Sequence, residues 1–289
     1  MPLSGQNYEH LFSYSWGALK EAAAKVVNNK NVFRYRVKTI KSGNALEVEI
    51  FPLWNLQNEI RAARINTTRP AQVNLNERNA KKNLVRKVNA NFTDQDYHIT
   101  LTYRGGVLPD EPQARRDMQN YIRRVRYYAK KNNLPPLKYI YVIEFASGDG
   151  RRRRVHHHLI INGGIDRQVL KDIWERGRVW VDELTPENGT LDGLALYMFK
   201  QPGKFIKSKR WAASRNLKRP HVTTSDHKIS KRQAETLAAD MEKSAPGIFS
   251  KIFNGYTFDD CTVKGSEFVA GAYIYAKMFK TVIWDGVRR

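Results

Sequence analysis

Between residues 97 and 184 the chain alternates extended and helical patterns in an order that few folds share. "YHITLTY" alternates with period two and is rich in β-formers, and residues 111–133 carry apolar side chains at helical spacing. Two strands, "LKYIYVIEF" and "VHHHLIIN", a helix, "DRQVLKDIWERG", and a last strand, "RVWVDEL", follow. The order β-α-β-β-α-β predicts a ferredoxin-like, RRM-like α+β fold, an antiparallel sheet with helices on one face. The other face is then free to hold a site.

The boundaries of the flanking elements follow from local signals. Asp166 and Gly177 are the expected start and stop of the second helix, and "LDGLALYMFKQ" predicts another. Upstream, "VFRYRVKTI" and "ALEVEIFPLW" flank "KSGN" and predict a hairpin, before a basic helix with Asn76 as N-cap. Downstream we expect a helix near 230–243 and apolar segments near 256–283. These patterns divide the chain into an N-terminal extension (1–92), a core (93–220) and a C-terminal extension (221–289).

Strand alternation divides the three consecutive histidines of "VHHHLIIN" between two faces. His156 and His158 share one face, while His157 joins Val155 and Leu159 on the other and is expected to be structural. Two imidazoles two residues apart can converge on one divalent ion, and Glu144, in an otherwise apolar strand, is the expected third ligand. Two histidines and one carboxylate leave coordination positions open, which suits Mg²⁺ or Mn²⁺ holding a phosphate oxygen. The alternative is a pair of polar residues that contact nucleic acid or backbone.

A tyrosine in "LALYMFKQ" is the candidate nucleophile. Tyr197 and Lys200 lie three residues apart and so share a helical face. A phenol is a poor nucleophile near its ordinary pKa of about 10, but a neighbouring ammonium and a metal-bound phosphate favour the phenolate. The alternative for Tyr197 is core or interface packing, which is also the expectation for the rival tyrosines Tyr103, Tyr127, Tyr128, Tyr273 and Tyr275.

The charge of the chain indicates a polyanionic partner. Lys and Arg total 50 against 28 acidic residues, so the net charge is +22. Nucleic acid is the expected polyanion, since each phosphate that Lys or Arg neutralises releases counterions. The alternative for these cations is a solvated turn and loop. The side chains expected on phosphates are Arg151, Arg152, Arg153, Arg154, Lys204, Lys207, Lys209, Arg210, Arg215, Lys218 and Arg219.

Several classes of protein are excluded by what the sequence lacks. No apolar stretch of about 18 residues and no signal peptide is present, so we expect no membrane partner and a cytoplasmic location. The single cysteine, Cys261, excludes a disulfide framework and Cys-rich zinc sites. A nucleotide-binding phosphate loop is also missing, so the chain carries no helicase of its own.

Three of these segments, in this order, resemble the motifs of a known family. "HITLTY", "VHHHLIIN" and "YMFK" are similar to the motifs of HUH endonucleases, specifically the single-tyrosine rolling-circle replication initiators of bacterial phages and plasmids. "KRWAASRNLKRP" resembles the segment that follows the tyrosine in the group related to gene II replication proteins. The resemblance covers Phe92 to Pro220, and more faintly "GAYIYAKMF". It departs at His157, where the family carries an aliphatic residue.

The resemblance implies an HUH endonuclease core in residues 93–220 and a mechanism. His156, His158 and Glu144 would hold Mn²⁺ or Mg²⁺, and Tyr197 would attack the scissile phosphate, leaving a 5′-phosphotyrosine and a free 3′-OH before the strand is rejoined. Lys200 would stabilise charge on the tyrosine and the phosphate. The implied partners are single-stranded or hairpin origin DNA and a separate host helicase and polymerase, in the cytoplasm of a bacterial host cell. The alternatives are a relaxase or transposase of the same chemistry, or a non-catalytic nucleic-acid-binding protein.

Overall fold

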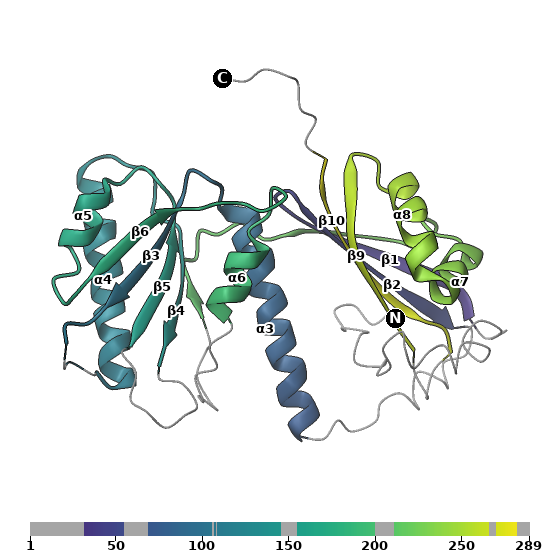
Figure 1. The fold of residues 1–289 in the computed structure, drawn as a ribbon, viewed down its shortest axis with the longest axis horizontal. Helices are drawn as coiled ribbons and strands as arrows, with labels where there is room; N and C mark the ends of the chain where they lie inside the picture. Colours follow the sequence, from purple (N-terminus) through teal and green to yellow (C-terminus); the bar gives the residue numbers. More distant parts are fainter. Residues whose placement is uncertain are drawn as a thin grey trace, which may run out of the picture. The chain divides into compact units, whose positions relative to one another are not determined.

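The computed structural model describes residues 32–54, 69–105, 107, 109–145, 155–199, 211–265 and 270–281. Within them, six helices and two five-stranded antiparallel sheets confirm the α+β class (Figure 1). The described residues before 78 and after 219 form one compact unit, and those from 78 to 219 form another. No helix among the described residues is long and apolar enough to cross a membrane.

The sheet of the 78–219 unit has the predicted ferredoxin-like order. Its strands run β6-β3-β5-β4-β7, and every neighbouring pair is antiparallel. If the strands are numbered by their order in the chain, the first four across the sheet are the fourth, first, third and second. The two-residue β7 adds an edge beside β4. The strands are β3 (Tyr97–Thr102), β4 (Tyr139–Glu144), β5 (His156–Ile161), β6 (Val179–Glu183) and β7 (Ala212–Ala213).

Two helices cover one face of this sheet, as predicted. α4 (Glu111–Lys131) and α5 (Arg167–Asp172) pack over it, with Tyr121, Leu159 and Leu170 in one buried cluster (Figure 1). Each helix begins at an aspartate whose side chain accepts a backbone N–H of the first turn, which satisfies a donor that the helix itself leaves unpaired. The predicted N-cap Asp166 is therefore confirmed.

The predicted stop of α5 at Gly177 is wrong, because the helix ends at Asp172. Gly177 has a different role. A Cβ at this position would lie 2.1 Å from the carbonyl oxygen of Thr102, far inside van der Waals contact. Glycine is needed here so that the chain can pass against β3 before it enters β6.

Two further helices pack on part of the opposite face. α3 (Arg69–Asn91) and α6 (Asp192–Phe199) cover it with a second apolar cluster that includes Leu84, Ile160 and Met198. The predicted N-cap at Asn76 is wrong, since α3 begins seven residues earlier. Pro70, at the second helical position, is typical of a first turn, where its missing N–H would be unpaired in any case.

The C-terminal end of α3 is joined to the last residues of this unit by a pair of hydrogen bonds. The Lys218 backbone N–H donates to Asn91 Oδ1 at 2.7 Å, and Asn91 Nδ2 donates to the Lys218 carbonyl at 3.0 Å. The end of α3 and the segment that leaves β7 are therefore adjacent.

The other unit is a sheet built from both ends of the described chain. Its order is β8-β1-β2-β10-β9, in which β2 pairs with β10. The predicted hairpin is confirmed, with Gly43 at a φ of 59° in its turn. The predicted helix near 230–243 is two helices, because Asp240 ends one and caps the next. The elements are β1 (Val32–Ser42), β2 (Ala45–Trp54), β8 (His221–Ser225), α7 (Lys231–Ala239), α8 (Met241–Ile252), β9 (Tyr256–Lys264) and β10 (Tyr273–Lys280).

Candidate metal centre

The three predicted metal ligands meet on adjacent strands. In the antiparallel register of β4 and β5, Glu144 lies opposite His156 and Val142 opposite His158, so Glu144, His156 and His158 share one face of the sheet. His158 Nε2 lies 3.2 Å from Glu144 Oε2, and His156 Nδ1 lies 3.8 Å from the same oxygen. One ligand atom from each residue lies within 4.8 Å of the other two. This triad therefore fits a metal ion.

The electrostatics of the triad keep its carboxylate available as a ligand. The imidazoles of His156 and His158 beside the carboxylate lower the pKa of Glu144 to about 2, although partial burial opposes the shift. The carboxylate is thus ionised at neutral pH. The His158 side chain is 5 % exposed and that of His156 37 %, so the triad opens to solvent on the His156 side. Three nitrogen and oxygen ligands on one open face leave room for water or a substrate oxygen at a divalent ion.

Tyr197 lies directly beside the triad. Its ring centroid is 5.5 Å from that of His158 in an edge-on arrangement at 84°, and its side chain is 56 % exposed. α6 docks through the buried residues Ala195 and Met198. An accessible phenol next to two histidines and a carboxylate is suited to attack an electrophile held there.

A buried asparagine fixes the start of the tyrosine helix. Asn89, on α3, accepts the Leu191 backbone N–H through Oδ1 at 2.7 Å and donates through Nδ2 to Asp192 Oδ1 at 2.6 Å. An eight-residue helix has little stability alone, so this anchor and the apolar docking hold Tyr197 in place.

The rival tyrosines lie elsewhere. Tyr103 and Tyr273 are buried, and Tyr275 donates to Glu47 in the other unit. Tyr127 is 69 % exposed, and Tyr128 packs at the margin of the α4 cluster, on the face opposite the triad. Among the tyrosines in the described ranges, Tyr197 is the one with a ring contact to the triad.

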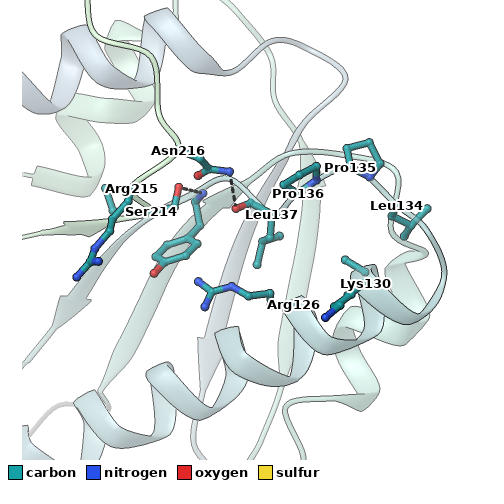
Figure 2. Close-up of a pocket in the computed structure, with 12 residues that line it drawn as sticks. Arg126, Lys130, Leu134, Pro135, Pro136, Leu137, Ser214, Arg215 and Asn216 are labelled. Atoms are coloured by element: carbon teal, nitrogen blue, oxygen red, sulfur yellow. Dashed lines mark hydrogen bonds between the residues drawn. The ribbon is translucent and has the colours of Figure 1, made fainter.

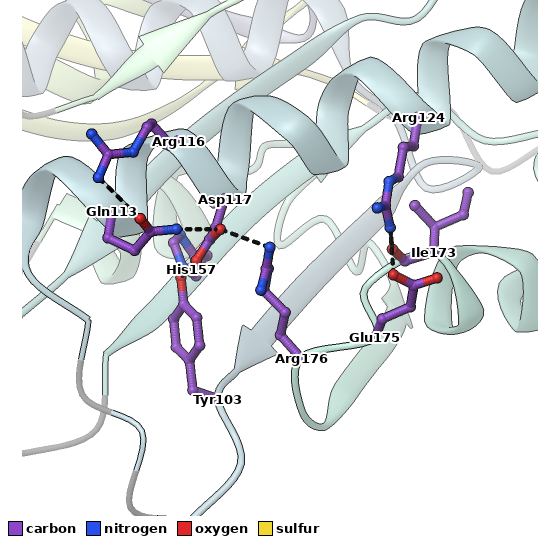
Figure 3. A network of polar contacts seen from close by, with 9 residues as sticks. All are labelled: Tyr103, Gln113, Arg116, Asp117, Arg124, His157, Ile173, Glu175 and Arg176. Atoms are coloured by element: carbon purple, nitrogen blue, oxygen red, sulfur yellow. Dashed lines mark hydrogen bonds and ion pairs between the residues drawn. The ribbon is translucent and has the colours of Figure 1, made fainter.

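His157 points to the other face, as predicted, and joins a buried polar network (Figure 3). Its Nε2 lies 3.1 Å from Tyr103 Oη, which donates to Asp117 Oδ2, also at 3.1 Å. Asp117 Oδ1 accepts from Gln113 and pairs with Arg176. Burial lowers the pKa of His157 to about 3, so the imidazole is neutral at physiological pH.

One residue of the metal face was missed by the sequence interpretation. His98, on β3, stacks on His158 with ring centroids 5.6 Å apart and ring planes within 6°. Burial lowers its pKa to about 4, and its buried Nε2 has no hydrogen-bond partner in the described structure. Strand alternation in "HITLTY" places His98 on one face with Thr100, which lies opposite His158. The alternation was visible in the sequence, but the register between β3 and β5 was not.

The predicted phosphate-binding cations are only partly within the described residues. Arg215, Lys218 and Arg219 are exposed, and none of their side chains has a hydrogen bond or ion pair to the triad in the part that the structure describes. The remaining predicted residues lie outside the described ranges: Lys200, Arg151, Arg152, Arg153, Arg154, Lys204, Lys207, Lys209 and Arg210.

Comparison with known proteins points to replication. Residues 96–204, well under half of the chain, match the family described as "Replication-associated protein ORF2/G2P". This segment contains β3 to α6, and with them the triad and Tyr197. The match supports a gene II-like replication protein. Searches of curated proteins and of solved structures found no match.

Proposed function

We propose that the chain is a metal-dependent DNA endonuclease and strand transferase of the single-tyrosine HUH type that initiates rolling-circle replication. The observation that carries this proposal is the position of Tyr197, exposed and in ring contact with His158 of the triad. The match of residues 96–204 to a replication-associated family supports the biological role. The net charge of +22 supports a nucleic-acid substrate.

Each residue has a defined task in the proposed reaction. Glu144, His156 and His158 would hold Mn²⁺ or Mg²⁺, which supplies positive charge to the oxygens of the scissile phosphate. Tyr197 loses its proton and its Oη bonds to phosphorus, the P–O3′ bond breaks, and the departing 3′ oxygen takes up a proton. The products are a 5′-phosphotyrosine and a free 3′-OH. Attack by a 3′-OH on this linkage restores the phosphodiester and releases Tyr197.

The proposed substrate is single-stranded or hairpin origin DNA, since the nucleophile needs in-line access to one phosphodiester. From its position in "YMFK", Lys200 is assigned the role of stabilising negative charge on the tyrosine and the phosphate. Because the sequence contains no nucleotide-binding phosphate loop, a separate host helicase would open the duplex and a host polymerase would extend the 3′-OH.

Covalent capture tests the nucleophile. Wild-type protein is incubated with Mn²⁺ and end-labelled single-stranded oligonucleotides tiled across the replicon that encodes it, and products are separated on a denaturing protein gel. We expect a labelled adduct in the wild type and none in Tyr197→Phe. Tyr127→Phe is the matched control, because Tyr127 is at least as accessible as Tyr197 and lies on α4, on the opposite side of the sheet. An adduct in Tyr197→Phe would show that the nucleophile is another residue.

Metal dependence separates the enzyme from a non-catalytic binder. We expect EDTA to abolish the adduct and Mn²⁺ or Mg²⁺ to restore it in the wild type but not in Glu144→Gln. A binder of the same fold predicts no adduct with any oligonucleotide and the same DNA affinity with and without metal. That result would contradict the proposed enzymatic function.

A further inference from the structure

A basic cavity lies at the edge of the sheet, away from the triad. It has a volume of about 730 Å³, within the range of small-molecule ligand sites. Residues of α4, the segment after it and the segment after β7 line it (Figure 2). Tyr139, in its wall, begins β4, whereas Glu144 ends it. Five steps of about 3.3 Å separate them, so the cavity lies about 17 Å from the triad along the strand.

The charges that line the cavity are all positive. Arg126 and Lys130 project from α4, and Arg215 comes from the opposite wall (Figure 2). All three side chains are exposed, and none forms an ion pair in the described structure. No carboxylate lines the cavity. Unpaired cations around a concave surface favour an anionic ligand.

The aromatic and rigid parts of the wall suit a flat ring. Tyr139 is half-buried and backed by the stacked ring of Tyr141, with centroids 6.2 Å apart. Pro135 and Pro136, with fixed φ angles, also line the cavity. Stacking on an aromatic side chain beside phosphate-binding cations is how proteins bind single-stranded nucleic acid without sequence preference.

Hydrogen bonds already fix the walls in position. Ser214 exchanges two bonds with the Tyr139 backbone, donating from its N–H to the carbonyl at 2.9 Å and accepting at Oγ at 3.1 Å. Asn216 Nδ2 donates to the Leu137 carbonyl at 3.2 Å. Arg215 lies between these two anchors, so its backbone is held while its guanidinium stays exposed. A preformed wall lowers the entropy that a ligand must lose on binding.

We propose that this cavity binds one base and its flanking phosphates of single-stranded DNA, as a second contact outside the triad. The identity of the polymer rests on the proposed function. The base stacks on Tyr139, and Arg126, Lys130 and Arg215 contact phosphates. Double-stranded DNA does not fit this mode, because its bases are already paired and stacked.

Equilibrium binding tests the cavity without any chemistry. Fluorescence anisotropy measures the affinity of the Tyr197→Phe protein for a labelled single strand in EDTA, over a range of salt concentrations. We expect Arg126→Ala and Arg215→Ala, placed in this background, each to weaken binding and to reduce the salt slope by about 1. Tyr139→Leu should weaken binding about tenfold with an unchanged slope, since stacking carries no charge.

A matched charge control and a duplex make the test decisive. Arg123→Ala removes the same charge from the same helix but outside the cavity, and should leave affinity and slope at the parent values. The proposal is overturned if the cavity variants bind like the parent, if Arg123→Ala weakens binding equally, or if duplex DNA is affected as strongly as the single strand. Preference for RNA of the same sequence would also overturn it.

The outcome is separable from that of covalent capture. If the wild type forms no adduct but the cavity variants lose single-strand binding, the proposed endonuclease activity is wrong and the proposed DNA contact in the cavity is supported. If the adduct forms and the cavity variants bind normally, the proposed DNA contact in the cavity is wrong and the proposed endonuclease activity is supported.

Discussion

The two faces of β5 carry the same residue type with opposite environments. His156 and His158 face Glu144 and Tyr197 on the side that opens to solvent, whereas His157 is fully buried against Tyr103 and Trp174. Both faces carry polar side chains at this point, but only the face of His156 and His158 presents ligand atoms that could bind a metal ion. The comparison teaches that a histidine in a sheet takes its role from the face it occupies. It predicts that changes on the metal face affect activity and changes on the buried face affect stability.

The largest expected effect is on the metal face. His156→Ala should lower the rate of adduct formation at least about 100-fold, because even the loss of a hydrogen-bond partner of a metal ligand costs about 10–100-fold. The melting temperature measured without metal should change little, since the His156 side chain is 37 % exposed. The check is the single-turnover rate with saturating Mn²⁺, beside thermal unfolding in EDTA. Full activity in His156→Ala would contradict the proposed role of the triad.

The same substitution one residue later should act in the opposite way. His157→Ala removes a fully buried ring and leaves Tyr103 Oη without that partner, so we expect a loss of about 2–4 kcal/mol in unfolding free energy. Denaturant unfolding measures this loss. At a temperature where the variant is folded, adduct formation should stay near the wild-type rate. A normal stability with a lost activity would place His157 in the reaction.

Acid should weaken the buried face. The folded-state pKa of His157, about 3, lies below its ordinary value of about 6.5. Between these two pH values the unfolded chain therefore binds a proton at this residue that the folded chain does not bind. The stability from this residue is full above pH 6.5 and falls as the pH drops from there toward 3. Replacing His157 by Gln should reduce the slope of stability between pH 6.5 and 5 by up to about 1.4 kcal/mol per pH unit. An unchanged slope would contradict this. His98, with a pKa of about 4, adds a slope of the same sign that the variant retains.

The smallest effect is expected from the link between His157 and Asp117. Tyr103→Phe keeps the ring but removes the hydroxyl that contacts both residues. We expect a loss of about 1–2 kcal/mol in unfolding free energy, since Asp117 keeps Gln113 and Arg176 as partners. Denaturant unfolding beside Tyr127→Phe, which lacks these contacts, provides the control. An effect as large as that of His157→Ala would show that the hydroxyl, rather than the imidazole, organises this face.

The parts of the molecule that the sequence predicted are those set by local patterns. Alternation in "VHHHLIIN" separated His157 from its neighbours, and "KSGN" marked the β1–β2 turn. The order of elements from β3 to β6 was enough to predict the sheet, because antiparallel ferredoxin-like pairing follows from it.

What the sequence did not predict depends on contacts between distant segments. β2 and β10 pair across more than two hundred residues, and no local signal specifies that partner. His98 reaches His158 only through the register of β3 on β5. In the sequence Asn89 is one polar residue on a basic helix. Its role as an anchor for the tyrosine helix depends on contacts with Leu191 and Asp192, which are distant in the sequence.

The bonds between Asn91 and Lys218 bear on how the inserted unit is held closed. Residues 78–219 are inserted within the other unit, and two hydrogen bonds tie the C-terminal end of α3 to the last residues of the insertion. The two bonded residues are 127 positions apart in the sequence. One asparagine therefore closes a loop that contains every strand of the unit's sheet, at an entropic cost that grows only slowly with the length of the loop.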